Sequence, residues 1–392
     1  MPLADTDRSF SFVYARHSRD ALRTTREMLM LVLSYHQVMP TFLDFLFPFG
    51  TQQYQQDFHF SGFRHESRLS DTDQGIQIPE LSRSGQEIQL CYSLKSVERS
   101  SHENDVDLPW SVRQSAVYHR FDVETGQATW IVIKGDQEMK KRLKAASERE
   151  PYLDSLIANN TASAFAATLE THLILCSWAG ENWRWYLNSL EEAVQTDTRH
   201  APVAMVQTQL PRANGEPPIT RVKRNLTGLE KDPVPPTQPA APNVPTIPLQ
   251  PLPNEPQSPP EVPPGPDDRL KADVQDDFSF SDLQRLQHIE EQVNDTLLVL
   301  ETNMSVLAEL KQHYQQASES EGFPVKLGLD SKKNLARFAK RVSNVSNDLK
   351  MQQSRAKTLL NLLANRKSLV SCSLIDCVQI LMTPALRDSG IS

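Results

Sequence analysis

The sequence predicts an α+β protein, in which a layered α/β/α N-terminal domain precedes a long antiparallel helical hairpin. Three observations predict it: alternating apolar residues over 87–97, a proline-rich segment in mid-chain, and a seven-residue apolar repeat after that segment. They divide the chain into an α/β domain at 1–200, a disordered proline-rich linker at 201–277, the hairpin or stalk at 278–371, and an irregular tail at 372–392.

Composition limits the classes of protein to which the chain can belong. Of its 392 residues 39% are hydrophobic, which suffices for a sizeable core, and its net charge of −8 argues against a nucleic-acid partner. The N-terminus lacks the basic start and apolar core of a secretory signal. We therefore expect a cytoplasmic protein in a reducing compartment, because no CxxC pair occurs among its cysteines. The cysteines are Cys91, Cys176, Cys372 and Cys377.

The first element is predicted to be a helix over Asp20–Gln37, capped by Ser18 or Asp20. Pro40 prevents its continuation, and Thr41 with Asp44 is expected to cap a short apolar helix that stops at Pro48 and Gly50. His36 would then lie in the last turn of the first helix, where its ring can bond unpaired carbonyls. A packed corner is favoured over a catalytic centre.

A sheet is expected next. Residues Glu87–Val97 alternate in polarity as a strand does, and Ser115–Gly135 reads as a hairpin whose loop spans Asp122–Gly126. The apolar period then changes to that of helices, which continue to about Ala193. The residues that carry this helical period are Leu153, Leu156, Ile157, Phe165, Leu169, Leu173 and Leu190.

The linker holds 19 of the 27 prolines, between Pro202 and Pro266. From Pro233 to Pro251 a proline recurs at every third residue, which is the period of polyproline II. A semi-rigid spacer is one interpretation, and a docking ligand for SH3 or WW domains is the other.

Two heptad repeats predict the arms of the hairpin, with a capping box at Ser281 and Gln284 opening the first. Gly322, Pro324 and Gly328 between the arms favour a reversal of the chain. The first seam is Leu286, Val293, Leu300, Leu307 and Tyr314, and the second is Leu335, Val342, Leu349, Ala356, Leu363 and Val370.

Signatures of catalysis are missing: the sequence has no GxGxxG, GxxxxGK[ST], GxSxG or HExxH pattern. His59 and His65 are candidate metal ligands, but they fit better as polar residues of an edge strand or turn. His119, three residues before Asp122, is expected to be a structural histidine rather than a general base. The acidic run from Asp267 to Asp282 has no EF-hand spacing and suits the approach to a helix N-terminus. The sequence thus predicts no enzyme and no catalytic, cofactor-binding or metal-ligating residue.

The most apolar late stretch, Leu369–Leu386, carries Asp376, Gln379 and Pro384. An acidic residue at the centre of a spanning helix costs about 3 kcal/mol. We therefore expect no transmembrane helix.

Several blocks in order resemble the soluble domain of the fungal CorA-like transporter family, over most of residues 10–195. The blocks are SYHQVMPTFLDFLFPFG, DFHFSGFR, LSRSGQEIQLCYSLKSVE, WSVRQSAVYHRFDVETGQATWIVIKG and ENWRWYLNSLEE. The helices after the linker are similar to those that lead from that domain toward the membrane. The resemblance implies an α/β/α domain, divalent-cation transport, chiefly of Mg²⁺, and a homopentamer. The family's Gly-Met-Asn pore motif does not occur here, so no ion-site residue is carried over.

Two explanations remain open: a shortened form of a longer transporter, which would then be a membrane protein, or a stand-alone descendant without the pore. The leading hypothesis is a regulatory, sensing or assembly role related to metal-ion transport, with Mg²⁺ the only ligand suggested. Its partners would be further copies or full-length relatives bound through the stalk. The alternative is a cytosolic scaffold that uses the helical seams and the polyproline edge.

Overall fold

The computed structural model describes residues 8–14, 21–50, 60–70, 74–100, 109–134, 138–147, 160–198 and 280–382. These residues lie in one compact unit formed by Met1–Pro202 and Phe278–Ser392. The predicted linker at 201–277 lies outside the described residues, so its proline period stays a prediction.

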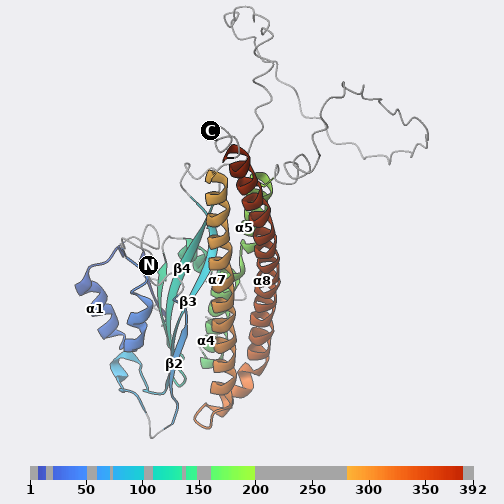
Figure 1. Ribbon diagram of the computed structural model, residues 1–392. Coiled ribbons are helices and arrows are strands. Elements are labelled where there is room, and N and C mark those ends of the chain that lie inside the picture. Colours follow the sequence, from blue (N-terminus) through green and yellow to red (C-terminus); the bar gives the residue numbers. More distant parts are fainter. Residues whose placement is uncertain are drawn as a thin grey trace, which may run out of the picture. The chain divides into compact units, whose positions relative to one another are not determined.

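Five strands form one mixed sheet (Figure 1) in the order β1-β5-β4-β3-β2. β1 pairs with β5 in parallel, and the other neighbours are antiparallel. The predicted strand is the longer β3, and the predicted hairpin is β4 and β5. The strands are β1 Arg8–Tyr14, β2 Phe63–Arg68, β3 Glu87–Arg99, β4 Trp110–Asp122 and β5 Ala128–Lys134.

The β4–β5 turn is held by the carboxylate of Asp122. Its oxygens accept hydrogen bonds from the backbone N–H groups of Ser84, Glu124 and Thr125 at 2.7 to 3.1 Å. Gly126 supplies the residue with positive φ, at 76°, which an L side chain adopts with difficulty. The predicted loop is confirmed, and Asp122 acts in it as a turn residue.

Both faces of the sheet are covered, which gives the predicted α+β layering. Leu90 and Trp130 belong to the larger core, shared with α4, α5, α7 and α8, whereas Tyr118 and Ile131 belong to a second core beneath α1 and η1. Successive side chains along a strand point to opposite faces, so alternate residues enter different cores. The N-terminal helices are α1 Arg26–Tyr35, η1 Pro40–Phe45, η2 Pro79–Leu81, α2 Glu138–Ser147, α4 Thr161–Gly180 and α5 Trp183–Asp197.

The corner after α1 forms as expected, but its boundaries differ. Thr25 caps the helix, because its hydroxyl accepts from the N–H of Met28, so neither Ser18 nor Asp20 does so. At the other end Gln37 has a positive φ of 50°, and Val38 N–H donates to Leu33 O in a Schellman arrangement. The second helix is the 3-10 segment η1, with no side-chain cap, so the predicted Thr41 and Asp44 cap was wrong.

The helical hairpin is formed by α7 Phe280–Glu319 and α8 Val325–Met382. Lys367 Nζ bonds Glu290 near one end, and Lys311 Nζ lies 3.2 Å from the Ser343 hydroxyl nearer the turn, so the helices are antiparallel. The first predicted seam is wholly buried, as are Val342, Leu349, Ala356 and Leu363 of the second. α8 continues to Met382, which corrects the expected irregular structure from residue 372 onward. Residues 372–382 lack the heptad period, but they contain no proline or glycine that would end the helix.

The hairpin tip touches the sheet through Gly322. A Cβ on this residue would lie 2.2 Å from the carbonyl oxygen of Leu69, which directly follows β2. Only glycine permits the two backbones to approach so closely.

The N-terminal and helical parts are further joined along the edge of β3. β2 pairs with β3 as far as Tyr92, and Ser93 N–H still donates to Gly62 O, but beyond Ser93 no described strand lies on that side of β3. Asn303 of α7 takes the place of a strand, because its amide accepts from Lys95 N–H at 3.0 Å and donates to Lys95 O at 2.7 Å. Asn182 donates to Val97 O at 2.8 Å in the same manner. Side-chain amides thus satisfy a buried strand edge.

Replacing Asn303 with alanine should lower the free energy of unfolding by about 2 kcal/mol, since two buried backbone groups lose their partners. Urea denaturation followed by circular dichroism measures the change. Asn294, exposed on the same helix, is the control, and Asn294→Ala should leave stability unchanged or slightly higher. Equal effects of both substitutions would contradict the role of Asn303.

Candidate functional site

The most polar part of the core is a chain of hydrogen bonds that crosses three layers. Tyr92 Oη of β3 lies 2.8 Å from His172 Nδ1 of α4, and His172 Nε2 lies 2.8 Å from Tyr314 Oη of α7. Tyr314 Oη is in turn 3.5 Å from Nδ1 of His119 on β4. We call Tyr92, His172, Tyr314 and His119 the polar junction. Each of its members is fully buried.

Burial keeps Tyr92, His172 and Tyr314 of the polar junction uncharged. It lowers the pKa of His172 well below its ordinary value, with the nearby charge of His313 as a smaller cause. It also raises the pKa values of Tyr92 and Tyr314 well above theirs. A neutral imidazole has one donor and one acceptor nitrogen, so His172 bonds one tyrosine as donor and the other as acceptor. The junction therefore holds β3, α4 and α7 in register.

Aromatic rings enclose this junction. The ring centroid of His119 is 4.0 Å from that of Trp130, and the centroid of His172 is 4.7 Å from that of Trp130. On the other side, the rings of His65 of β2 and His313 of α7 lie 4.5 Å apart. His313 is 3% exposed, and burial, followed by the charge of His65, lowers its pKa to about 3. His119 is packed among these rings, and the sequence gives no sign of its link to Tyr314.

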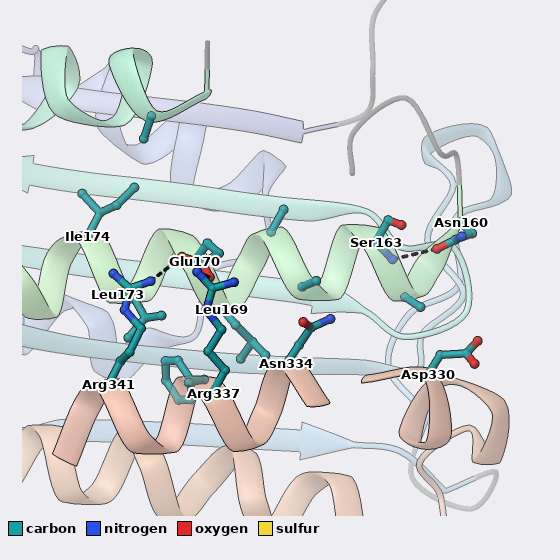
Figure 2. A pocket seen from close by; sticks show the side chains of 15 residues that line it. Asn160, Ser163, Leu169, Glu170, Leu173, Ile174, Asp330, Asn334, Arg337 and Arg341 are labelled. Carbon is teal, nitrogen blue, oxygen red and sulfur yellow. Dashed lines mark hydrogen bonds and ion pairs between the residues drawn. The ribbon is translucent and has the colours of Figure 1, made fainter. Parts of the chain in front are cut away.

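A cavity of about 700 Å³ lies between α2, α4 and α8 (Figure 2), with alanines of α4 in its wall. Each carboxylate oxygen of Glu170 on α4 forms an ion pair with an arginine of α8. The partners are Arg341 at 2.8 Å and Arg337 at 3.5 Å. Asp330 also lines the cavity. The lining therefore holds two cationic and two anionic side chains, whose charges cancel. These ion pairs join α8 to α4. Because the charges cancel, the lining favours neither an anionic nor a cationic ligand.

The corner after α1 holds another histidine. His36 follows the last residue of α1, and its pKa is lowered to about 4 by burial first, then by the charges of Arg120 and Arg83. Its buried Nδ1 bonds no described residue, so this atom does not make the carbonyl bond expected of it. Arg120 and Arg83 instead donate to the carbonyls of His36 and Tyr35, at 3.0 and 2.9 Å. Positive charge at a helix C-terminus complements its dipole.

His65 lies on the edge strand β2, as expected, and is exposed, whereas His59 lies outside the described residues. The acidic run is outside them too, except for Asp282 in the first turn of α7. Within the described ranges no group of three histidine, cysteine or acidic residues is arranged to hold a metal ion.

Sequence reasoning missed His172 and Asn303, and it placed Tyr314 in the first seam without its polar role. A faint signal existed for two of them: His172 is a polar residue within the apolar run THLILCSWAG, and Asn303 lies inside the first heptad arm. Nothing in the chain's pattern indicates that they meet β3, because their partners are 80 and 208 residues away.

A family model described as CorA-like transporters matches residues 2–202. The chain belongs to the CorA-like transporters. The matched residues include the whole sheet, α1 to α5, and two members of the polar junction that contact α7. No curated protein matches this CorA-like chain.

Among the described residues of this CorA-like protein, none of the helices has an apolar stretch of the length that a bilayer crossing requires.

Proposed function

We propose that this CorA-like chain acts in divalent-cation transport, chiefly of Mg²⁺, in a regulatory, sensing or assembly role rather than as the conducting pore. The observation that carries the proposal is that the family-matched domain and the hairpin share one hydrophobic core. Membership of a transporter family supports a role in cation transport. The shared core supports a role in which the domain and the hairpin move as one body.

The coupling between the two parts is both apolar and polar. Leu300 and Leu307 of the hairpin are 0% exposed in the core that also holds Trp130 and Leu173. Among the polar contacts, Arg355 of α8 pairs with Glu191 of α5 at 2.5 Å. A change in the domain that repositions α4 or α5 must therefore move α8 or break these contacts, because packed interiors do not deform continuously.

Magnesium influx tests the proposed role in transport. Cells that lack the chain are compared with the same cells after the full chain is restored, at low external Mg²⁺ and with a fluorescent Mg²⁺ indicator. We expect the influx rate to change on loss of the chain and to return on its restoration, while K⁺ content stays constant. Identical Mg²⁺ influx in both cell lines would rule out a transport-related role.

Thermal unfolding in the presence of Mg²⁺ separates sensing from assembly. If the folded chain binds Mg²⁺, the midpoint temperature should rise steadily with the logarithm of Mg²⁺ concentration, by the equivalent of about 3 kcal/mol at one hundred times the dissociation constant. NaCl at matched ionic strength is the control. A flat response to Mg²⁺ together with altered influx would favour assembly, and the partners we propose for it are further copies or full-length CorA-like relatives.

The scaffold alternative predicts unchanged stability with Mg²⁺ and no effect on influx. The seam residues of α7 are buried within this chain's own core, so a scaffold partner would have to bind another surface. The polyproline edge predicted for residues 233–251 and the exposed face of α1 are two candidate surfaces for such a partner.

A further inference from the structure

Two histidines meet where the hairpin packs against the edge of the sheet. His65 lies on the edge strand β2 and His313 lies on α7, and the centroids of their rings are 4.5 Å apart. Figure 1 shows β2 beside α7. His65 is exposed, whereas His313 is buried. The pair therefore has one side that is open to solvent and one side that is closed by the core.

The buried ring carries a nitrogen without a partner. His313 Nε2 is buried and bonds no described residue, which is uncommon for a polar atom inside a protein. The rings of Phe63, Tyr314 and His65 surround His313, with centroids 5.7, 5.5 and 4.5 Å from its own. Among these three neighbours, the closest ring is also the one that carries nitrogen atoms. A ligand of His313 Nε2 can therefore be shared with His65.

We propose that His65 and His313 together bind one divalent transition metal of the zinc class, with water at its remaining coordination positions. Imidazole nitrogen is a preferred ligand of Zn²⁺, whereas Mg²⁺ is held by oxygen atoms. The inference thus concerns a different metal from the one in the proposed function, and it does not depend on that function.

The spacing of the two rings suits a shared ion. Zinc–nitrogen bonds of about 2.1 Å at a tetrahedral angle put the centroids of two bound imidazole rings about 5 Å apart. The observed distance of 4.5 Å is close to this value, and the exposed side chain of His65 can turn between rotamers. A small rotation of His65 brings one of its nitrogens within reach of an ion on His313 Nε2. The open side of the pair admits the ion and its water ligands.

A metal at this position would join the two parts of the molecule. His65 belongs to the family-matched residues 2–202, and His313 belongs to the hairpin, next to Tyr314 of the polar junction. Because both ligands are in place only while α7 lies on the sheet, an ion that binds them stabilises that arrangement. Zinc would therefore strengthen the docking of the hairpin on the domain.

Calorimetric titration of the chelator-treated full chain with Zn²⁺ tests the site. Cys372 and Cys377 are changed to serine in every sample, because thiolates also bind zinc. We expect His65→Gln to weaken zinc binding by at least about tenfold, since even the loss of a residue that only orients a metal ligand costs that much. His288→Gln is the matched control and should keep the original affinity, because His288 is exposed on the same helix and its ring bonds Gln292.

A double-mutant cycle tests whether one ion is shared. If both histidines hold the same ion, the variant that combines His65→Gln and His313→Gln should lose less affinity than the product of the two single losses. Circular dichroism checks that the buried replacement His313→Gln still folds, and the comparison of His65→Gln with His288→Gln stands without it. Single losses that multiply in full would assign the histidines to separate ions and overturn the proposal.

Thermal unfolding gives a second readout. Zn²⁺ should raise the midpoint temperature more in the chain with His65 than in His65→Gln, while any response to Mg²⁺ should be the same in both. Equal zinc affinity with and without His65, or a Mg²⁺ response that His65→Gln removes, would overturn the proposal. Magnesium influx into cells is not part of this comparison, so the proposed function is judged separately.

Discussion

Replacing Gly322 with alanine is expected to lower the free energy of unfolding by about 3 kcal/mol or more, because the new methyl group has no room. Its Cβ would lie 2.2 Å from Leu69 O and 2.5 Å from Leu69 C. These are backbone atoms at the end of the strand β2, so relief requires the hairpin tip to move away from the sheet. Chemical denaturation of the full chain measures the loss.

Gly328→Ala provides the matched control. Gly328 lies in the first turns of α8, and an added Cβ would come no closer than 3.7 Å to any atom. Alanine there should stabilise the helix by up to about 1 kcal/mol, because it loses less backbone freedom than glycine does. If the two alanine variants were equally stable, the close approach of the hairpin tip to β2 would be wrong.

Acid is expected to destabilise the protein between pH 6.5 and pH 3, chiefly through its buried histidines. The pKa of His313 is about 3 in the folded chain, against an ordinary 6.5. Between these values the unfolded chain binds a proton that the folded chain does not, so the stabilising effect is complete above pH 6.5 and is lost as the pH falls. For His313 alone the loss is about 2 kcal/mol at pH 5 and about 4 kcal/mol at pH 3.

The variant His313→Leu should reduce this dependence. Between pH 6 and 4.5, the slope of the unfolding free energy against pH should fall by about 1.4 kcal/mol per unit, which corresponds to one proton. His288, exposed on the same helix, is the control, and His288→Gln should keep the wild-type slope. An unchanged slope for His313→Leu would show that His313 takes up a proton without unfolding. His172 contributes in the same direction, because its folded pKa is also lowered.

Local sequence patterns were sufficient to predict most of the helices, strands and turns. Leu286, Val293 and Leu300 repeat every seven residues and are all fully buried, so periodicity alone located the hairpin. Turn chemistry located the β4–β5 loop through Asp122 and Gly126. The start of α1 was misplaced because several polar residues could cap it, and the choice of Thr25 depends on where the helix meets the sheet.

Contacts between distant segments were not accessible to the same reasoning. His172 and Tyr314 are separated by 142 residues, and their hydrogen bond depends on the packing of α4 against α7. The pairing of Asn303 with the Lys95 backbone, and the approach of Gly322 to Leu69, depend in the same way on tertiary arrangement. Residue type at one position carries no information about such a partner, so the polar junction could be found only in the folded chain.

The amides of Asn303 and Asn182 along β3 have a consequence for solubility. If α7 lifted away, the N–H and C=O groups of Lys95 would lose their partners beside apolar side chains, while Asn182 before α5 would still bond Val97 O. Such an open edge recruits strands from other molecules and seeds aggregation. The hairpin thus protects the sheet against uncontrolled polymerisation, and any event that loosens it exposes the protein to fibril-like association.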